Sequence, residues 1–251
     1  MKLVTLIENT TTQAALPAEH GLSLYIETGK HRILFDMGQS AAFADNADTL
    51  GIDLKKIDFA VLSHGHYDHG GGMRRFLEIN SHVPVYVNQY AFEPHFNASG
   101  KDIGLDPSLP KDRIRFVKDS LTLAPGLQLC TVPFPPADTA GMTTAGNQPE
   151  DFRHEQYLLV EEDGKRILIS GCSHKGIVGI AEYFRPDILV GGFHFMKTED
   201  ESILSEAARR LLALNCTYYT GHCTGQQQYA YLKARMGQQL HSLSTGSEVV
   251  L

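Results

Sequence analysis

Near the start of the chain, apolar and polar residues alternate with the period of two that is typical of half-buried strands. The alternation covers residues 2–8, 22–27 and 32–36, with a turn at 28–31. This pattern predicts an antiparallel meander at the start of the fold. A helix over about 41–50 is expected to link the meander to the apolar run 58–62, which predicts a further strand.

The second half of the chain alternates between strand and helix patterns. The predicted order from Tyr157 is strand 157–161, strand 166–170, helix 176–184, strand 187–191, helix 199–214, strand 216–220 and helix 225–236. In the middle of the chain, strands are predicted at 84–88, 114–117, 121–123 and 127–132. Together the patterns indicate an α/β fold.

Two segments lack a regular pattern. Residues 91–113 show no period, and no element is assigned to them. Residues 133–152 contain four prolines, two glycines and few large apolar groups, so we expect a flexible loop there. Such a loop is equally compatible with a lid over a site and with an idle surface segment, because composition alone does not report function.

The composition limits the class of protein. With 251 residues and 42% hydrophobic content, the chain fits one domain over residues 1–251. A net charge of −7 argues against nucleic acid as a partner, because no surface would neutralise a row of phosphates. A small-molecule substrate is therefore favoured.

The sequence shows neither a membrane-targeting segment nor a pattern of paired cysteines. The first apolar run ends at Glu8, and no stretch is apolar over the roughly 18 residues that a membrane span needs. We therefore expect a cytoplasmic protein with no membrane partner. The four cysteines form no Cys-x-x-Cys pair, which favours reduced thiols.

The strongest chemical signal is the segment Ser-His-Gly-His-Tyr-Asp-His-Gly at 63–70, directly after the apolar run 58–62. It places His64, His66, Asp68 and His69 on one loop. Imidazole and carboxylate groups are ligands that Zn²⁺, Fe and Mn²⁺ accept. The segment therefore predicts a metal site at the end of a strand, with room for two ions.

This segment resembles the His-x-His-x-Asp-His signature of the metallo-β-lactamase superfamily. Three further motifs, Gly-Cys-Ser-His-Lys-Gly-Ile (171–177), Gly-Gly-Phe-His-Phe (191–195) and Thr-Gly-His-Cys-Thr-Gly (220–225), are similar to one subfamily. That subfamily comprises metal-dependent hydrolases, with some archaeal members assigned as synthases of a dihydropterin ribofuranosyl-aminobenzene phosphate. The resemblance implies a four-layer αββα sandwich and one or two zinc ions, with Fe or Mn²⁺ as alternatives.

The resemblance also implies roles for single residues. His222 matches the last histidine ligand, and Asp36 matches a carboxylate that supports the metal loop from behind. Cys172 stands where the superfamily usually has an aspartate that bridges two metals; a small buried hydrophobe is the alternative. One more histidine ligand is expected before this strand, for which we favour His154 over Glu155.

Other polar residues follow predicted strands at the same edge. His174 shares a face with Cys172 and is a candidate ligand or acid–base group, while His194 is a candidate for proton transfer and substrate contact. Lys175, at the start of a helix, would suit an anionic substrate group together with free backbone N–H groups. His20 is a further candidate for substrate binding. The remaining histidines have no motif around them and are expected on the surface or in loops: His31, His82, His95 and His241.

The resulting hypothesis is a hydrolase that uses metal-activated water on an ester, amide or phosphoester of a small anionic substrate. Asp68 would ligate and orient the nucleophile, and His174 or His194 would protonate the leaving group. The alternatives are a pterin-transferring synthase, an iron-dependent redox enzyme on the same ligands, and a binding module without catalysis.

Overall fold

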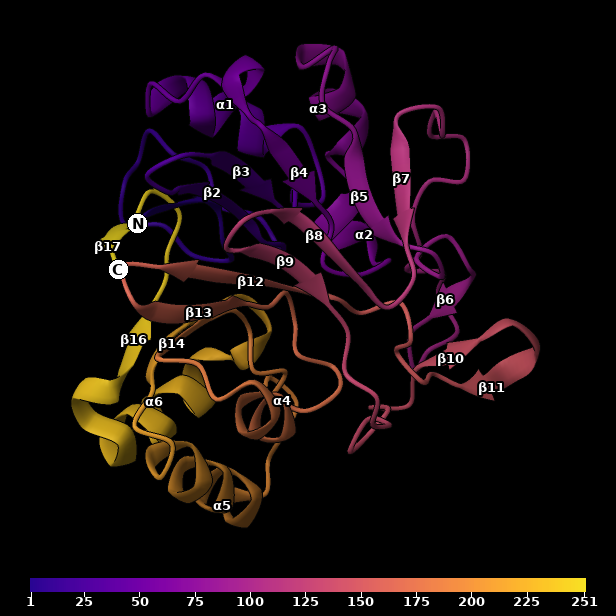
Figure 1. Cartoon of the computed structure of the whole chain (residues 1–251). Helices are drawn as coiled ribbons and strands as arrows, with labels where there is room; N and C mark the ends of the chain where they lie inside the picture. The colour runs from indigo at the N-terminus through magenta and orange to yellow at the C-terminus, as the bar shows by residue number, and fades with distance from the viewer.

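The computed structural model describes residues 1–251, and two seven-stranded sheets packed face to face form its centre (Figure 1). The first sheet has the strand order β17-β1-β2-β3-β4-β5-β7. Its strands are β1 (Lys2–Ile7), β2 (Ser23–Glu27), β3 (Arg32–Phe35), β4 (Phe59–Val61), β5 (Val85–Asn88), β7 (Ile114–Val117) and β17 (Glu248–Val250). The predicted meander of β1, β2 and β3 is confirmed.

The second sheet has the strand order β16-β15-β14-β13-β12-β9-β8. Its strands are β8 (Ser120–Ala124), β9 (Leu127–Cys130), β12 (Tyr157–Glu162), β13 (Lys165–Ile169), β14 (Ile188–Val190), β15 (Thr217–Thr220) and β16 (Leu240–Ser242). The sequence pattern did not predict the two C-terminal strands β16 and β17, which are short and follow no clear alternation.

The two sheets share one pattern of strand directions. In the first, β17, β1, β2 and β3 are antiparallel neighbours, whereas β3, β4, β5 and β7 are parallel. In the second, β8, β9, β12 and β13 are antiparallel, whereas β13, β14, β15 and β16 are parallel. Parallel neighbours end at the same edge, so residues that follow β3, β4, β13, β14 and β15 can meet.

Helices cover the outer faces of both sheets. Figure 1 shows α1 (Ala42–Thr49) and α3 (Met73–Ile79) on one side, and α4 (Ile177–Phe184), α5 (Glu201–Leu212) and α6 (Gln226–Met236) on the other. Three clusters of buried apolar side chains fill the spaces between the four layers, and the middle cluster lies between the sheets. The expected αββα sandwich is confirmed.

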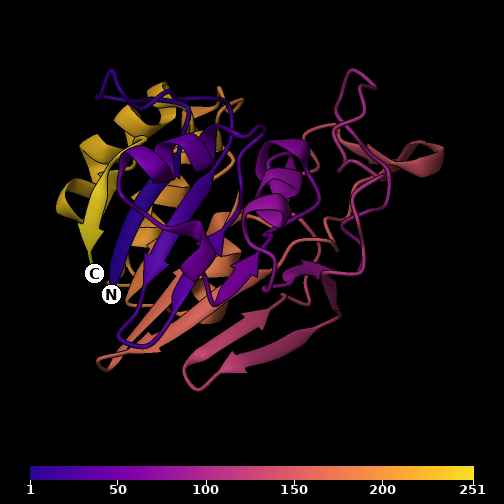
Figure 2. The same ribbon diagram turned by 90° about the horizontal axis from the view of Figure 1, so that it is seen from above.

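A small third sheet corrects our description of the irregular segments. It joins β6 (His95–Phe96) to β10 (Thr143–Thr144) and β11 (Gln148–Pro149). Two short strands therefore lie within 133–152, where we expected a flexible loop, and β10 pairs with β6 of the unassigned segment 91–113. The two views agree that the β10–β11 hairpin extends away from the body (Figures 1 and 2). No helix combines the length and the apolar content that crossing a bilayer requires.

Candidate metal centre

The loop that follows β4 is anchored by a single buried carboxylate. Asp36, which follows β3, accepts hydrogen bonds from the Ser63 backbone N–H and the Ser63 hydroxyl, each at 2.7 Å. Its Oδ2 also lies 2.7 Å from His69 Nδ1. The side chains of Asp36 and His69 are completely buried. Asp36 therefore lies behind the loop that carries His64 and His69.

These contacts determine which ring nitrogens carry hydrogens. His69 donates from Nδ1 to Asp36, so the lone pair of its neutral ring is on Nε2. The Ser63 hydroxyl already donates to Asp36, so His64 donates to Ser63 Oγ from Nδ1, at 2.8 Å. Its Nε2 is likewise a free acceptor. Both rings thus present the atom that binds a cation.

His222 enters the same space from the end of β15. Its Nδ1 lies 2.8 Å from Asn9 Oδ1, an acceptor, so its lone pair is also on Nε2. Glu8 Oε1 accepts the His222 backbone N–H at 2.6 Å and fixes the turn. His222 Nε2 lies 3.2 Å from His69 Nε2 and 3.2 Å from Asp68 Oδ2.

Two imidazole acceptors at this separation need a positive charge between them. Ligand nitrogens held at 2.0–2.1 Å in a tetrahedral zinc site lie about 3.3 Å apart, close to the observed separation. Without a metal ion, a proton fills this role. Burial opposes the charge, but Asp36 and Asp68 outweigh it and raise the pKa of His69 to about 9. His69, His222 and Asp68 therefore fit one cation position.

Asp68 is ionised in this surrounding. Burial disfavours its charge, but His69, His20 and His222 outweigh burial and hold the pKa of this carboxyl well below its usual range. His20 Nε2 lies 3.2 Å from Asp68 Oδ2, and the His20 side chain is exposed at the rim. His20 thus reaches the centre through Asp68.

Cys172 and His174 form a second grouping next to the first. His174 Nε2 lies 3.3 Å from His64 Nε2, and the His174 ring stacks on Phe152 at 4.4 Å. Cys172 Sγ lies 3.2 Å from His69 Nε2 and also belongs to the group of His64 and His174, whose ligand atoms lie within 4.8 Å of one another. The thiol is buried between both positions, and burial raises its pKa well above the usual value.

His66 and His154 also lie close together. His154 Nδ1 accepts the Gly65 backbone N–H at 2.8 Å, so the hydrogen of its neutral ring is on Nε2. His95, which we expected on the surface or in a loop, is instead 1% exposed and stacks on His154 at 3.9 Å. That expectation is wrong because pairing of β6 with β10 carries His95 into the interior.

Glu155 and Lys175 both contact other groups of the protein. Glu155 accepts the backbone N–H groups of His174 and Lys175 at 2.7 and 3.0 Å, and the Tyr157 hydroxyl. The N–H groups that we expected to be free for a substrate are therefore occupied. Lys175 Nζ donates to the Phe134 carbonyl at 3.2 Å, and its side chain is only partly exposed.

His194 lies at the rim, after β14, with its ring 4.3 Å from that of His174. Burial, followed by His222 and Lys197, lowers the pKa of His194 to about 4, so its ring is neutral near pH 7. A neutral ring donates one hydrogen bond and accepts another, which suits substrate contact better than proton donation as an imidazolium.

Four residues around the centre have a strained backbone. Positive φ angles occur at Asp36 (60°), Ser173 (59°), His194 (58°) and His222 (45°), each one to four residues after the end of a strand. Non-glycine residues rarely adopt this conformation, and it tends to persist at functional sites. Gly171 brings β13 against the metal loop, since a Cβ there would lie 2.2 Å from Ser63 Oγ.

Four contributors were missed by sequence reasoning: Glu8, Asn9, His95 and Glu150. Glu8 and Asn9 end the first apolar run, and this polar break after β1 is the one signal that points to them. His95 and Glu150 have no comparable signal, because a two-residue strand brings them inward.

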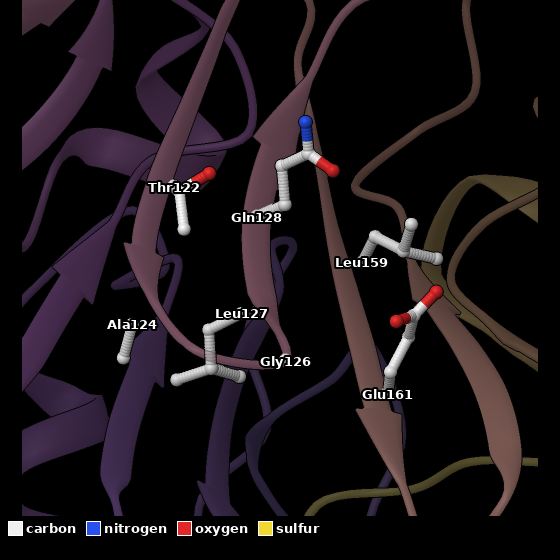
Figure 3. Close-up of a pocket in the computed structure, with 7 residues that line it drawn as sticks. All are labelled: Thr122, Ala124, Gly126, Leu127, Gln128, Leu159 and Glu161. Carbon is white, nitrogen blue, oxygen red and sulfur yellow. The ribbon is translucent and has the colours of Figure 1, made fainter.

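A separate hollow of about 190 Å³ lies over β8, β9 and β12 (Figure 3). It is lined by Thr122, Ala124, Gly126, Leu127, Gln128, Leu159 and Glu161. None of these is a histidine or cysteine, so the hollow offers no comparable metal chemistry.

Comparison with known proteins agrees with this geometry. Residues 16–180 match the family model described as the metallo-beta-lactamase superfamily. The chain belongs to the metallo-β-lactamase superfamily. A relative from Methanocaldococcus jannaschii, named 7,8-dihydropterin-6-methyl-4-(beta-D-ribofuranosyl)-aminobenzene-5'-phosphate synthase, is 31% identical over 83% of this chain and 82% of its own.

Solved structures show the same metallo-β-lactamase fold. The crystal structure of Tm1679, described as a metal-dependent hydrolase of the beta-lactamase superfamily, has a TM-score of 0.82. It is 26% identical, and the match covers 100% of this chain and 99% of that one. Zn²⁺-bound PqqB from Methylobacterium extorquens has a TM-score of 0.62 at 13% identity, with both chains fully covered, and shares the fold alone.

Proposed function

We propose that this superfamily member is a metal-dependent hydrolase with a binuclear centre that acts on a small anionic substrate. One observation carries the proposal. Two pairs of imidazole Nε2 atoms, His69 with His222 and His64 with His174, face each other at 3.2 and 3.3 Å, with the Cys172 thiol between them. Buried imidazole nitrogens this close together are stabilised by a shared cation.

The donors indicate which metal fits. One position has His69, His222 and Asp68, the other has His64 and His174, and Cys172 lies within reach of both. Zinc accepts imidazole, carboxylate and thiolate together, whereas a thiolate is a poor ligand for magnesium or calcium. We therefore propose Zn²⁺ at both positions. When bound, a divalent cation supplies Lewis acidity, which makes water a nucleophile near neutral pH.

The chain's own residues would then direct the reaction. The ionised Asp68 can accept a hydrogen bond from the nucleophile and orient it, since its Oδ2 faces the centre. His20 and His194 at the rim can donate N–H groups to substrate oxygens. We expect these two residues, together with Lys175, to favour an anionic group, and the neutral His194 ring to donate a hydrogen bond to the leaving group.

The test is elemental analysis of protein purified without added metal, combined with hydrolysis assays on ester, amide and phosphoester substrates. We expect about two zinc ions at His64–His174 and His69–His222, and activity that disappears on chelation and returns with zinc. His69→Ala and His222→Ala should each lose metal and activity, whereas His82→Ala, at an exposed histidine, should lose neither. Full activity in the stripped wild-type protein would overturn the proposal.

A second candidate is a synthase that joins a pterin to a ribosyl-aminobenzene phosphate. The observation that favours it is the name of the Methanocaldococcus jannaschii relative, which aligns over most of this chain. Incubation with a reduced pterin diphosphate and a ribosyl-aminobenzene phosphate separates the two functions. A condensed product would support the synthase, whereas hydrolysis without condensation would support the hydrolase.

A further inference from the structure

A second buried thiol lies beside Cys172 and has no role in the proposed centre. Cys223 follows His222 after β15 and is 7% exposed, and its Sγ donates to the Cys172 carbonyl at 3.5 Å. Its sulfur belongs to none of the groups of neighbouring metal-binding atoms, whereas the sulfur of Cys172 belongs to two of them. Cys223 is therefore next to the centre without being one of its candidate ligands.

The side chains of Cys172 and Cys223 interact with each other. Burial raises the pKa of the Cys172 thiol, and the neighbouring Cys223 thiol adds most to this effect. The backbone of Gly192 passes both residues, since a Cβ there would lie 2.3 Å from Cys223 Sγ and 3.6 Å from Cys172 Cα. Glycine at this position therefore leaves room for the Cys223 sulfur beside Cys172.

The other two cysteines have different surroundings. Cys130 lies on β9 and is partly exposed, and the charged group that acts on its thiol is Arg166. Cys216 precedes β15, and its Sγ donates to the Thr217 carbonyl at 3.5 Å. Neither sulfur forms a hydrogen bond with another cysteine. Cys172 and Cys223 are thus the thiol pair of this chain whose members are in contact.

We propose that Cys172 and Cys223 form a reversible disulfide when hydrogen peroxide enters the site, and that this bond removes Cys172 from the metal ligands. The inference rests on the proposed function, because a metal beside Cys172 would hold this thiol as the thiolate, which is the form that attacks peroxides. Any substrate has to approach the centre through the rim, where the His20 side chain is exposed, and a peroxide can take the same route.

The reaction has two steps. The Cys172 thiolate attacks one peroxide oxygen, and the O–O bond breaks to give a sulfenic acid and hydroxide. The Cys223 sulfur then attacks the sulfenic sulfur, so that an S–S bond replaces the S–O bond and the thiol proton leaves with the hydroxyl group as water. The two thiols lose two electrons, and one hydrogen peroxide becomes two waters. A disulfide sulfur carries no negative charge, so both proposed cation positions lose a ligand.

Peptide mapping tests the pair directly. Zinc-loaded protein would be treated with hydrogen peroxide, and the remaining thiols would be alkylated before digestion and mass spectrometry. We expect the four free thiols to fall to two, a peptide that links Cys172 to Cys223, and release of zinc to a coloured chelator. Dithiothreitol should restore the thiols and, with added zinc, the metal content. Absence of the linked peptide from oxidised wild-type protein would overturn the inference.

Two variants separate this pair from general oxidation. Cys223→Ser keeps Cys172, so it should bind zinc as the wild type does, but dithiothreitol should not restore it after peroxide because Cys172 is then oxidised to sulfinic acid. Cys130→Ser is the matched control and should recover fully. Full recovery of Cys223→Ser would contradict the role of Cys223. The zinc content before oxidation tests the proposed function separately, and protein without zinc would overturn that function whatever the peptide map shows.

Discussion

The two sheets have the same order of strand directions, yet they supply the proposed metal centre in different ways. After β4, the first sheet supplies His64, His66, Asp68 and His69 from one loop. The second sheet supplies single residues after three strands: Cys172 and His174 after β13, His194 after β14 and His222 after β15. The candidate ligands of the first sheet are therefore neighbours in the sequence. Those of the second sheet are far apart in the sequence and come together only in the folded chain.

This difference has consequences for how the ligands are held. Asp36 orients both His64, through Ser63, and His69, so one carboxylate controls half of the ligands on the loop. On the second sheet, each residue has its own support: Asn9 and Glu8 hold His222, and Glu155 holds the backbone of His174. Substitutions of these supporting residues should therefore reduce metal affinity by different amounts.

The largest effect is expected for Asp36→Asn. The amide loses the charge that fixes the His69 ring and interrupts the chain through Ser63 to His64, so both cation positions should weaken. We expect metal affinity to fall toward the upper end of the 10- to 100-fold range that is typical for such partners. Competition with a chelator of known affinity measures this change. Wild-type affinity in the folded variant would show that the loop holds its shape without Asp36.

Cys172→Ser should have the next largest effect, because the thiol lies within reach of both positions. The hydroxyl is a weaker zinc ligand than a thiolate, so we expect a loss of about 10-fold or more in affinity at both positions. Cys130→Ser is the matched control, since Cys130 is partly exposed on β9, away from the centre. Equal affinities of the two variants would assign Cys172 to the core.

Asn9→Ala should have a smaller and more local effect. It removes the acceptor for His222 Nδ1 and leaves the backbone hydrogen bond to Glu8 in place. We expect affinity at the His69–His222 position to fall about 10-fold and the His64–His174 position to stay unchanged. Stepwise cobalt titration separates the two events. A loss at both positions would contradict the independence of the second sheet's supports.

The smallest effect concerns pH in the metal-free protein. The pKa of His69 is raised to about 9 from an ordinary value of 6.5, so its proton stabilises the folded state fully below about pH 6.5. This contribution is lost as the pH rises through about 9. We therefore expect chelated protein to lose stability between pH 7 and 10, measured by urea unfolding, and His69→Gln to lose less. The opposite slope would contradict the ion pair with Asp36.

Structure could be predicted from the sequence where it depends on residues that are close together in the chain. The meander and the helices of the second half show periodic patterns, and these predictions agree with the structure. His95 and Glu150 could not be predicted, because their position depends on a short strand that pairs β6 with β10. The ring nitrogen of His154 that carries the hydrogen could not be predicted either. It depends on a tertiary contact with the Gly65 N–H, and the two residues are far apart in the sequence.

The most direct test of the central claim is a crystal structure of protein purified without added metal, with anomalous diffraction measured on both sides of the zinc absorption edge. We expect anomalous density between His69, His222 and Asp68, and between His64 and His174, with Cys172 beside both. Density at neither position, with the side chains arranged as here, would contradict the metal centre.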